Sequence, residues 1–192
     1  MTKLTNFLVL LLVLNFSSYS QNFLSTSGSS IVNENGDTII FRGMGLGGWM
    51  VQEGYMMAPG GFSSTQYQIK DRLIELIGEE ETDVFYHNWL SNHVRKIDID
   101  SMKQWGFNLI RVPIHYNLFT EPIENEPFPN AYTEKEIGFT LLDSLLSWCK
   151  QNQIYLMIDL HAAPGGQGYN ADISDYDPTK PSLWESTLNQ NK

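Results

Sequence analysis

Two largely apolar runs, at residues 107–114 and 154–160, dominate the pattern of hydrophobic and polar positions along the chain. Neither run shows the alternation of apolar and polar residues that is typical of a strand with one solvent-exposed face. Such runs are typical of strands buried on both faces of a parallel sheet. A shorter, glycine-rich strand is predicted over residues 43–48, where the backbone can approach a neighbouring strand closely.

Segments with helical periodicity separate these strands. We predict helices over the following ranges: 67–77, 82–94, 98–105 and 133–151. Asp98 is the predicted N-cap of the third helix, and Thr133 with Glu136 forms the pattern of a capping box that opens the fourth. Ser182 and Glu185 repeat that pattern close to Lys192. Strands that alternate with helices in this order predict a parallel sheet with right-handed crossovers.

The beginning of the chain has the pattern of an export signal. Lys3 is followed by an almost unbroken apolar stretch over residues 7–16 and by a small-x-small site ending at Ser20. The stretch is shorter than the roughly 20 residues that span a bilayer, although an uncleaved anchor is the alternative. We therefore expect a signal peptide at 1–20, a loose lead-in at 21–30, one domain over 31–192, and a secreted, extracellular or periplasmic, protein.

Composition narrows the kinds of partner. Residues 21–192 hold 11 Lys and Arg against 22 Asp and Glu, which argues against nucleic acid and an anionic membrane surface as partners and is compatible with a neutral substrate. Cys149 is the single cysteine, so an internal disulfide is impossible, and its apolar neighbours predict a buried side chain. The pattern leaves the oligomeric state open.

No metal or organic cofactor is predicted. His87 and His93 do not have the spacing of zinc ligands on one helical face. The acids Asp172, Asp175 and Asp177 lack the spacing and turn glycine of a calcium loop, so we interpret them as a solvated loop. The glycines of residues 43–48 do not match a nucleotide fingerprint.

Polar side chains at the carboxyl ends of the two long strands are the candidates for chemistry. His161 closes the second run, with Asp159 one pleat below it, and Pro-Gly-Gly follows. Loops after parallel strands are where α/β folds place their sites, so we interpret His161 as a site residue and Asp159 as its hydrogen-bonding support. Arg111 lies within an otherwise apolar strand and must face a carboxylate or a polar cavity; a purely structural ion pair is the alternative.

Three motifs now occur in chain order, at residues 43–53, 106–114 and 159–167. They read Gly-Met-Gly-Leu-Gly-Gly-Trp-Met-Val-Gln-Glu, Gly-Phe-Asn-Leu-Ile-Arg-Val-Pro-Ile and Asp-Leu-His-Ala-Ala-Pro-Gly-Gly-Gln. Together they resemble glycoside hydrolase family 5, the family of cellulases and exo-β-glucanases, at the positions of its first three barrel strands. The resemblance covers the chain from about residue 31 onward. It implies the N-terminal part of a (β/α)8 barrel, preceded by a β-hairpin that the Asn35–Gly36 pair predicts.

The resemblance also implies a function and roles for residues. The family hydrolyses β-glycosidic bonds with retention, using two glutamates whose carboxyl groups lie about 5–5.5 Å apart. Arg111 corresponds to an arginine beneath the nucleophile, His161 to a histidine at the cleaved bond and Glu53 to a substrate-binding glutamate. His115 and Tyr116 take the pocket-rim position after the second strand. Trp49 and Asp159 are expected to support the site.

The two catalytic glutamates themselves are expected beyond Lys192, because they follow the fourth and seventh strands in the family. Asn125-Glu126-Pro127 spells an acid/base motif, but it lies in a loop after the second strand, and we reject it. We therefore expect an inactive N-terminal fragment of a hydrolase of β-glucans or related polysaccharides. The alternative is a secreted, non-catalytic carbohydrate-binding protein on a degenerate barrel. The aromatic residues of the same loop can either stack on sugar rings or pack the loop: Tyr116, Phe119, Phe128 and Tyr132.

Overall fold

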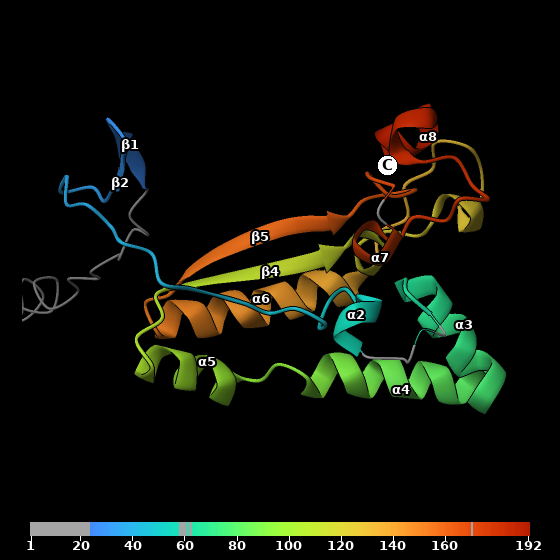
Figure 1. Ribbon diagram of the computed structural model, residues 1–192, viewed down its shortest axis with the longest axis horizontal. Helices are drawn as coiled ribbons and strands as arrows, with labels where there is room; N and C mark the ends of the chain where they lie inside the picture. The colour runs from blue at the N-terminus through green and yellow to red at the C-terminus, as the bar shows by residue number, and fades with distance from the viewer. Residues whose placement is uncertain (1–23, 58–60, 62, 170) are drawn as a thin grey trace, which may run out of the picture. The chain divides into compact units, whose positions relative to one another are not determined.

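The computed structural model describes residues 24–192 except 58–60, 62 and 170, and the expected signal peptide at 1–20 lies outside the described residues. The chain divides into two units, Met1–Ile40 and Phe41–Lys192, and the second holds the parallel sheet and the helices of the described residues (Figure 1). No helix among the described residues has the length and apolar character that crossing a membrane requires.

The first unit contains a small antiparallel hairpin. Strand β1 (Ser25–Ser27) pairs with β2 (Ser30–Val32), so regular structure begins inside the segment for which the sequence predicts a loose lead-in. A second turn follows at Asn35–Gly36, where the Asn33 side chain accepts hydrogen bonds from the backbone N–H groups of Asn35 and Asp37. There the expected hairpin closes with a single antiparallel bridge, from Val32 to Thr38.

A parallel three-stranded sheet forms the second unit, as the sequence predicts. Strand β4 (Leu109–His115) lies between β3 (Gly43–Gly45) and β5 (Tyr155–Ala162). The register places Arg111 beside Gly45 on one side and beside Met157 on the other. Three 3-10 turns complete the connections: η1 (Tyr116–Leu118), η2 (Ile123–Asn125) and η3 (Leu183–Glu185).

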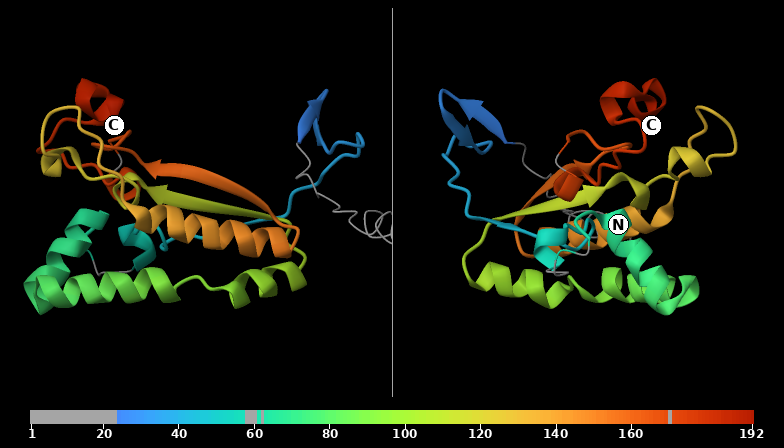
Figure 2. Two further views of the ribbon diagram at one scale, coloured as in Figure 1. Left: turned by 180° about the vertical axis from the view of Figure 1, so that it is seen from behind. Right: turned by 45° about the vertical axis from the view of Figure 1, so that its right-hand side comes forward.

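The helices lie close to the predicted ranges. Their bounds are α2 (Gly54–Met57), α3 (Gln66–Ile77), α4 (Glu79–Asn92), α5 (Lys96–Gln104), α6 (Glu136–Gln151), α7 (Ala171–Ser174) and α8 (Thr187–Asn191). Figures 1 and 2 show α6 lying along one face of β4 and β5, with α5 beyond it, whereas α7 and α8 lie near the carboxyl ends of these strands.

Three predicted helix starts differ from the structure. Asp98 is not an N-cap: it lies inside α5, and its carboxylate accepts the Arg95 backbone N–H at 2.8 Å. Thr133 does not cap α6, because its hydroxyl donates to Glu126 at 2.7 Å instead. The Ser182–Glu185 capping box does form, but it opens the short η3 turn rather than a long helix.

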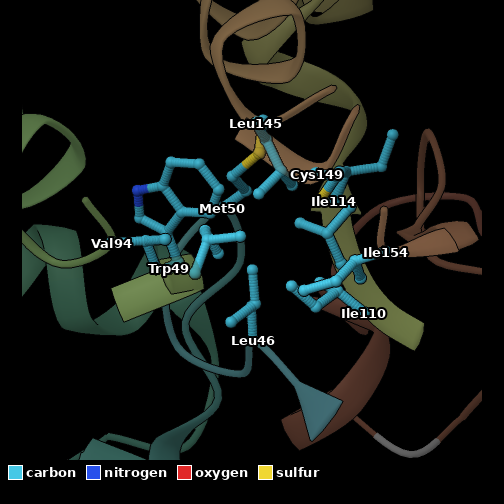
Figure 3. Close-up of a cluster of buried hydrophobic side chains, with 11 residues drawn as sticks. Leu46, Trp49, Met50, Val94, Ile110, Ile114, Leu145, Cys149 and Ile154 are labelled. Carbon is cyan, nitrogen blue, oxygen red and sulfur yellow. The ribbon is translucent and has the colours of Figure 1, made fainter. Parts of the chain in front are cut away.

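One face of β4 supplies the centre of the hydrophobic core. Ile110 and Val112 are 0% exposed and belong to one cluster with Leu145 and Cys149 of α6. Figure 3 shows Ile110, Leu145 and Cys149 in this cluster. Cys149 is buried as predicted, and burial raises the pKa of its thiol to about 11. Trp49 joins the same cluster from the segment after β3 (Figure 3). The alternation of β4 therefore places its even-numbered residues against the helices.

Strand β5 is more open than its apolar sequence predicts. Met157, Ile158 and Leu160 are each about half exposed, at 49%, 54% and 53%. In the part of the chain that the structure describes, β5 is an edge of the sheet, and no strand pairs with its outer side. Full burial of this strand therefore depends on groups other than the described residues.

The core predicts a sharp difference between two neighbouring leucines of α6. Leu145→Ala in the full-length protein should lower the free energy of unfolding by about 2 to 5 kcal/mol, because a fully buried side chain leaves a cavity. Leu146→Ala is the control, because Leu146 is 44% exposed and its loss should cost less than about 1 kcal/mol. Urea unfolding followed by circular dichroism measures both, and equal losses would contradict this core.

Candidate functional site

Four of the predicted residues form one polar network: Arg111, Asp159, His161 and Glu53. The Arg111 guanidinium makes an ion pair with the Asp159 carboxylate. The Nδ1 atom of His161 lies 2.9 Å from the same carboxylate, and its Nε2 atom lies 3.1 Å from Oε1 of Glu53. The imidazole is thus held between two carboxylates, with one ring nitrogen facing each.

The strand geometry explains why these groups meet. Odd-numbered residues of β4 and β5 point away from the face that packs on α6, and Arg111, Asp159 and His161 all occupy odd positions. Parallel strands bring their carboxyl ends to the same edge of the sheet, so residues 48 and 50 positions apart in the chain become neighbours. The network contains the ion pair that we gave as the structural alternative for Arg111, together with a histidine and a second carboxylate.

Glu53 reaches the network from the segment that follows β3. Its backbone is held closely, because a Cβ atom on the next residue, Gly54, would lie 2.5 Å from the Ser64 backbone. The Glu53 side chain is 4% exposed, so its charge needs partners. His161 is one partner, and the Tyr55 hydroxyl, 3.2 Å from Oε2, is the other.

Tyr55 was not predicted as a site residue. The residue is 63% exposed, yet its hydroxyl contacts the buried Glu53 carboxylate. Desolvation of the hydroxyl raises the pKa of Tyr55, and the negative charge of Glu53 raises it further. Tyr55 lies two residues after Glu53 in the sequence, and this proximity was the one available signal.

His115 and Tyr116 lie in a second cluster. The Nδ1 atom of His115 accepts the Asn117 backbone N–H at 3.1 Å, so the ring proton is on Nε2 and points at Oδ2 of Asp175, 2.9 Å away. The Tyr116 ring stacks on the His115 ring with centroids 5.0 Å apart. Burial is the main reason that the pKa of Tyr116 is raised.

Asp175 corrects our interpretation of the acids after β5 as a solvated loop. Its side chain is only 12% exposed, and besides His115 it binds the Tyr67 backbone N–H at 2.9 Å. It therefore ties the loop after β5 to the start of α3 and to the end of β4. The sequence did not indicate this role, because the partners lie 60 and 108 positions away.

An open pocket of about 680 Å³ lies beside this second cluster. His115, Tyr116 and Asp175 line it, with Lys180 and Glu124 on the facing loops. Lys180 is ion-paired with Glu124. Burial raises the pKa of Glu124, but the hydrogen bond from Lys180 and its positive charge help to bring that pKa below its ordinary value. Arg111, His161 and Glu53 are not among the lining residues, so the structure separates the predicted residues into two groups.

Trp49 and Glu126 make contacts within the fold and do not join the polar network. Trp49 is 1% exposed, and its indole N–H donates to the Leu90 carbonyl at 2.8 Å. Glu126, of the motif that we rejected, is 4% exposed, accepts both donors of Thr133 and pairs with Lys192. Among the described residues no group of histidine, cysteine and acidic side chains is arranged to hold a metal ion.

Of the two roles that the sequence left open for the loop aromatics, the structure shows packing for Phe119. Phe119 packs against the core and meets Phe139 edge to face at 5.1 Å, so it holds the loop on its scaffold. Phe128 and Tyr132 are 64% and 53% exposed. The ammonium group of Lys192 lies 4.9 Å from the centre of the Tyr132 ring.

Polar side chains that meet toward the carboxyl ends of parallel strands are typical of α/β proteins, which place their binding and catalytic sites there. Residues 68–189 match the sequence model of the family "Cellulase (glycosyl hydrolase family 5)", and the chain belongs to this family. The resemblance predicted from the three motifs is thereby confirmed.

Relatives with curated names agree with the family. A β-xylosidase from Phanerodontia chrysosporium is 34% identical over 164 residues, which cover 85% of this chain and 32% of the relative. A probable glucan 1,3-β-glucosidase A from Aspergillus niger is 33% identical over 130 residues, covering 67% of this chain and 29% of the relative. The chain thus spans about a third of the length of the curated relatives it matches.

Solved structures support the fold. The rutinosidase from Aspergillus niger superposes with a TM-score of 0.51 at 20% identity, over 68% of this chain and 35% of that one. A structure titled AoRut gives a TM-score of 0.53 at 18% identity, over 71% of this chain and 36% of that one. These similarities confirm an α/β fold that matches part of a barrel enzyme.

The second cluster predicts that Asp175 stabilises the fold. Asp175→Ala in the full-length protein should lower the free energy of unfolding by about 1 to 3 kcal/mol, because buried His115 and the Tyr67 N–H lose their acceptor. Asp83→Ala is the control, because the Asp83 side chain is 70% exposed and its loss should change stability by less than about 0.5 kcal/mol. Denaturant unfolding measures both, and an Asp175 variant as stable as the control would contradict the assignment.

Proposed function

We propose that the protein is a secreted, retaining glycoside hydrolase that acts on β-glucans or related β-linked polysaccharides. The observation that carries the proposal is the network of Glu53, His161, Asp159 and Arg111, which runs from the middle of β4 to the carboxyl end of β5. Family membership supports it, as do the names of the relatives, which include glucan 1,3-β-glucosidases and a glucan endo-1,6-β-glucosidase. Secretion is supported by the signal-like pattern of residues 1–20.

In this proposal Glu53 and His161 bind the hydroxyl groups of the sugar at the cleaved bond. A buried carboxylate that is already oriented accepts hydrogen bonds from hydroxyl groups without first losing water or side-chain freedom. His161 keeps Glu53 in place through the 3.1 Å contact, and Asp159 and Arg111 keep His161 in place from the other side.

Arg111 is proposed to act on the nucleophile. Its guanidinium side chain is 44% exposed on the face of the sheet away from α6, so it is accessible to a carboxylate beyond Asp159. A fixed positive charge lowers the pKa of a neighbouring carboxyl group and keeps it ionised for attack on the sugar. We place the nucleophile and the acid/base glutamate outside these 192 residues.

A non-catalytic carbohydrate-binding protein is the second candidate. It would use the same polar network for binding, and Glu126, the described glutamate with acid/base-like neighbours, is bound to Thr133 and Lys192 instead of lying in that network. The described residues thus supply side chains suited to sugar binding without an assigned proton donor. The two candidates differ in turnover but not in binding.

The test measures turnover on a panel of β-1,3-, β-1,4- and β-1,6-linked glucans, xylan and aryl β-glycosides. The full-length protein should release sugar with retained configuration, which proton NMR reads from the first anomer formed. The 192-residue polypeptide alone should release none, because the apolar residues of β5 are exposed and the two glutamates are absent from the proposed site. Binding without any turnover by the full-length protein would favour the second candidate.

Replacement of Arg111 tests its proposed electrostatic role. In the full-length enzyme Arg111→Ala should move the acidic limb of the kcat/KM profile about one to three pH units higher, because the nucleophile loses the cation that lowers its pKa. Arg72→Ala is the control, since Arg72 lies on α3 and pairs with Glu75. An unchanged pH profile in a folded Arg111 variant would remove this residue from the site.

A further inference from the structure

The indole of Trp184 is both exposed and firmly held. Its side chain lies in the η3 turn, and the residue is 69% exposed. The indole N–H donates to the Gln167 carbonyl at 2.7 Å, so its polar edge already has a protein partner. What remains open to solvent is the apolar surface of the ring system.

Hydrogen bonds on both sides fix the turn that carries Trp184. The Ser182 N–H and hydroxyl both donate to one Glu185 oxygen, at 3.0 and 2.9 Å. The Leu183 N–H donates to the Gly166 carbonyl at 3.0 Å, and the Gln190 amide caps the Leu183 carbonyl at 3.0 Å. An exposed side chain usually keeps its rotational freedom, whereas here both the backbone and the indole N–H are tied down.

The same hydrogen bonds connect Trp184 to the polar network. Gln167, which accepts the indole N–H, donates its side-chain amide to the His161 carbonyl at 2.6 Å. Its amide oxygen accepts the Ala163 N–H at 3.0 Å. Trp184 therefore lies on the loop that follows β5, at the end of the sheet where α7 and α8 are seen in Figures 1 and 2.

We infer that the indole of Trp184 is a stacking site for a pyranose ring of the β-linked chain, one that lies outside the sugar held by Glu53 and His161. A β-linked pyranose presents a face of axial C–H groups, which packs on an aromatic face, while its equatorial hydroxyls stay in water. An indole with a satisfied N–H and an open ring surface suits this ligand. The inference rests on the proposed function, from which it takes the class of ligand.

Trp105 provides a matched control. It is 70% exposed, almost the same as Trp184, but it follows α5 and precedes β4 at the opposite end of the sheet. A change at Trp105 removes the same exposed surface without touching the loops at the carboxyl ends of the strands. Any difference between the two variants therefore reports location rather than the general loss of a tryptophan.

The experiment compares Trp184→Ala, Trp184→Phe and Trp105→Ala in the full-length protein. Affinity electrophoresis in native gels that contain a β-1,3-, β-1,4- or β-1,6-linked glucan, or xylan, measures binding without requiring turnover. Trp184→Ala should weaken binding to the retained polysaccharide about tenfold, and the ratio of kcat/KM for a hexasaccharide over a disaccharide should fall by a similar factor. Trp184→Phe keeps an aromatic face and should recover most of both, and Trp105→Ala should match the wild type.

The outcomes separate this inference from the proposed function. Turnover with a length dependence that is the same in all variants overturns the stacking site and leaves the hydrolase proposal standing. Retardation that depends on Trp184, without turnover, supports the stacking site and overturns the hydrolase proposal. A protein that neither turns over nor binds any of these polysaccharides overturns both. Thermal unfolding of each variant shows whether the fold is kept, and a folded Trp184→Phe variant that behaves like Trp184→Ala contradicts stacking.

Discussion

The two-residue alternation of β4 is the constraint on which the rest of this structure depends. Ile110 and Val112 face the helices and are fully buried, and Arg111 between them must point the other way. Burial of the even positions selects one register, because a shift by one residue would place a guanidinium in the dry core. Burial of Ile110 and Val112 thus fixes the direction of the Arg111 side chain. The same alternation along β4 therefore determines both the packing of the core and the geometry of the polar network.

The charged network has little freedom once that register is set. The Arg111 guanidinium meets Asp159 and His161 on the neighbouring strand, and His161 in turn meets the buried Glu53. Glu53 is the buried charge of the network, so removal of His161 would leave its carboxylate with the Tyr55 hydroxyl as its remaining side-chain partner in the network. Such a network resists rotation of its side chains, which is what a site that binds hydroxyl groups requires.

The loop residues are positioned by hydrogen bonds between distant segments rather than by the alternation of a strand. His115, Asp175 and the start of α3 are held by hydrogen bonds between segments that are distant in sequence, and Trp184 is held through Gln167. Their side chains are typical of loops, and only the spatial partner distinguishes Asp175 from a solvated acid. The loop after β5 is therefore built from contacts that bridge the end of β4, α3 and the η3 turn.

The sequence by itself determined the order of strands and helices, the parallel sheet and the group of Arg111, Asp159 and His161, because apolar runs and strand parity are local properties. It also indicated the family through three motifs in order. The tertiary structure alone decided the partners of Asp175 and the start of α6, where Thr133 binds Glu126 instead of capping the helix. Each of these depends on which acceptor the folded chain places beside a given donor, and propensity and hydrophobic pattern do not specify that pairing.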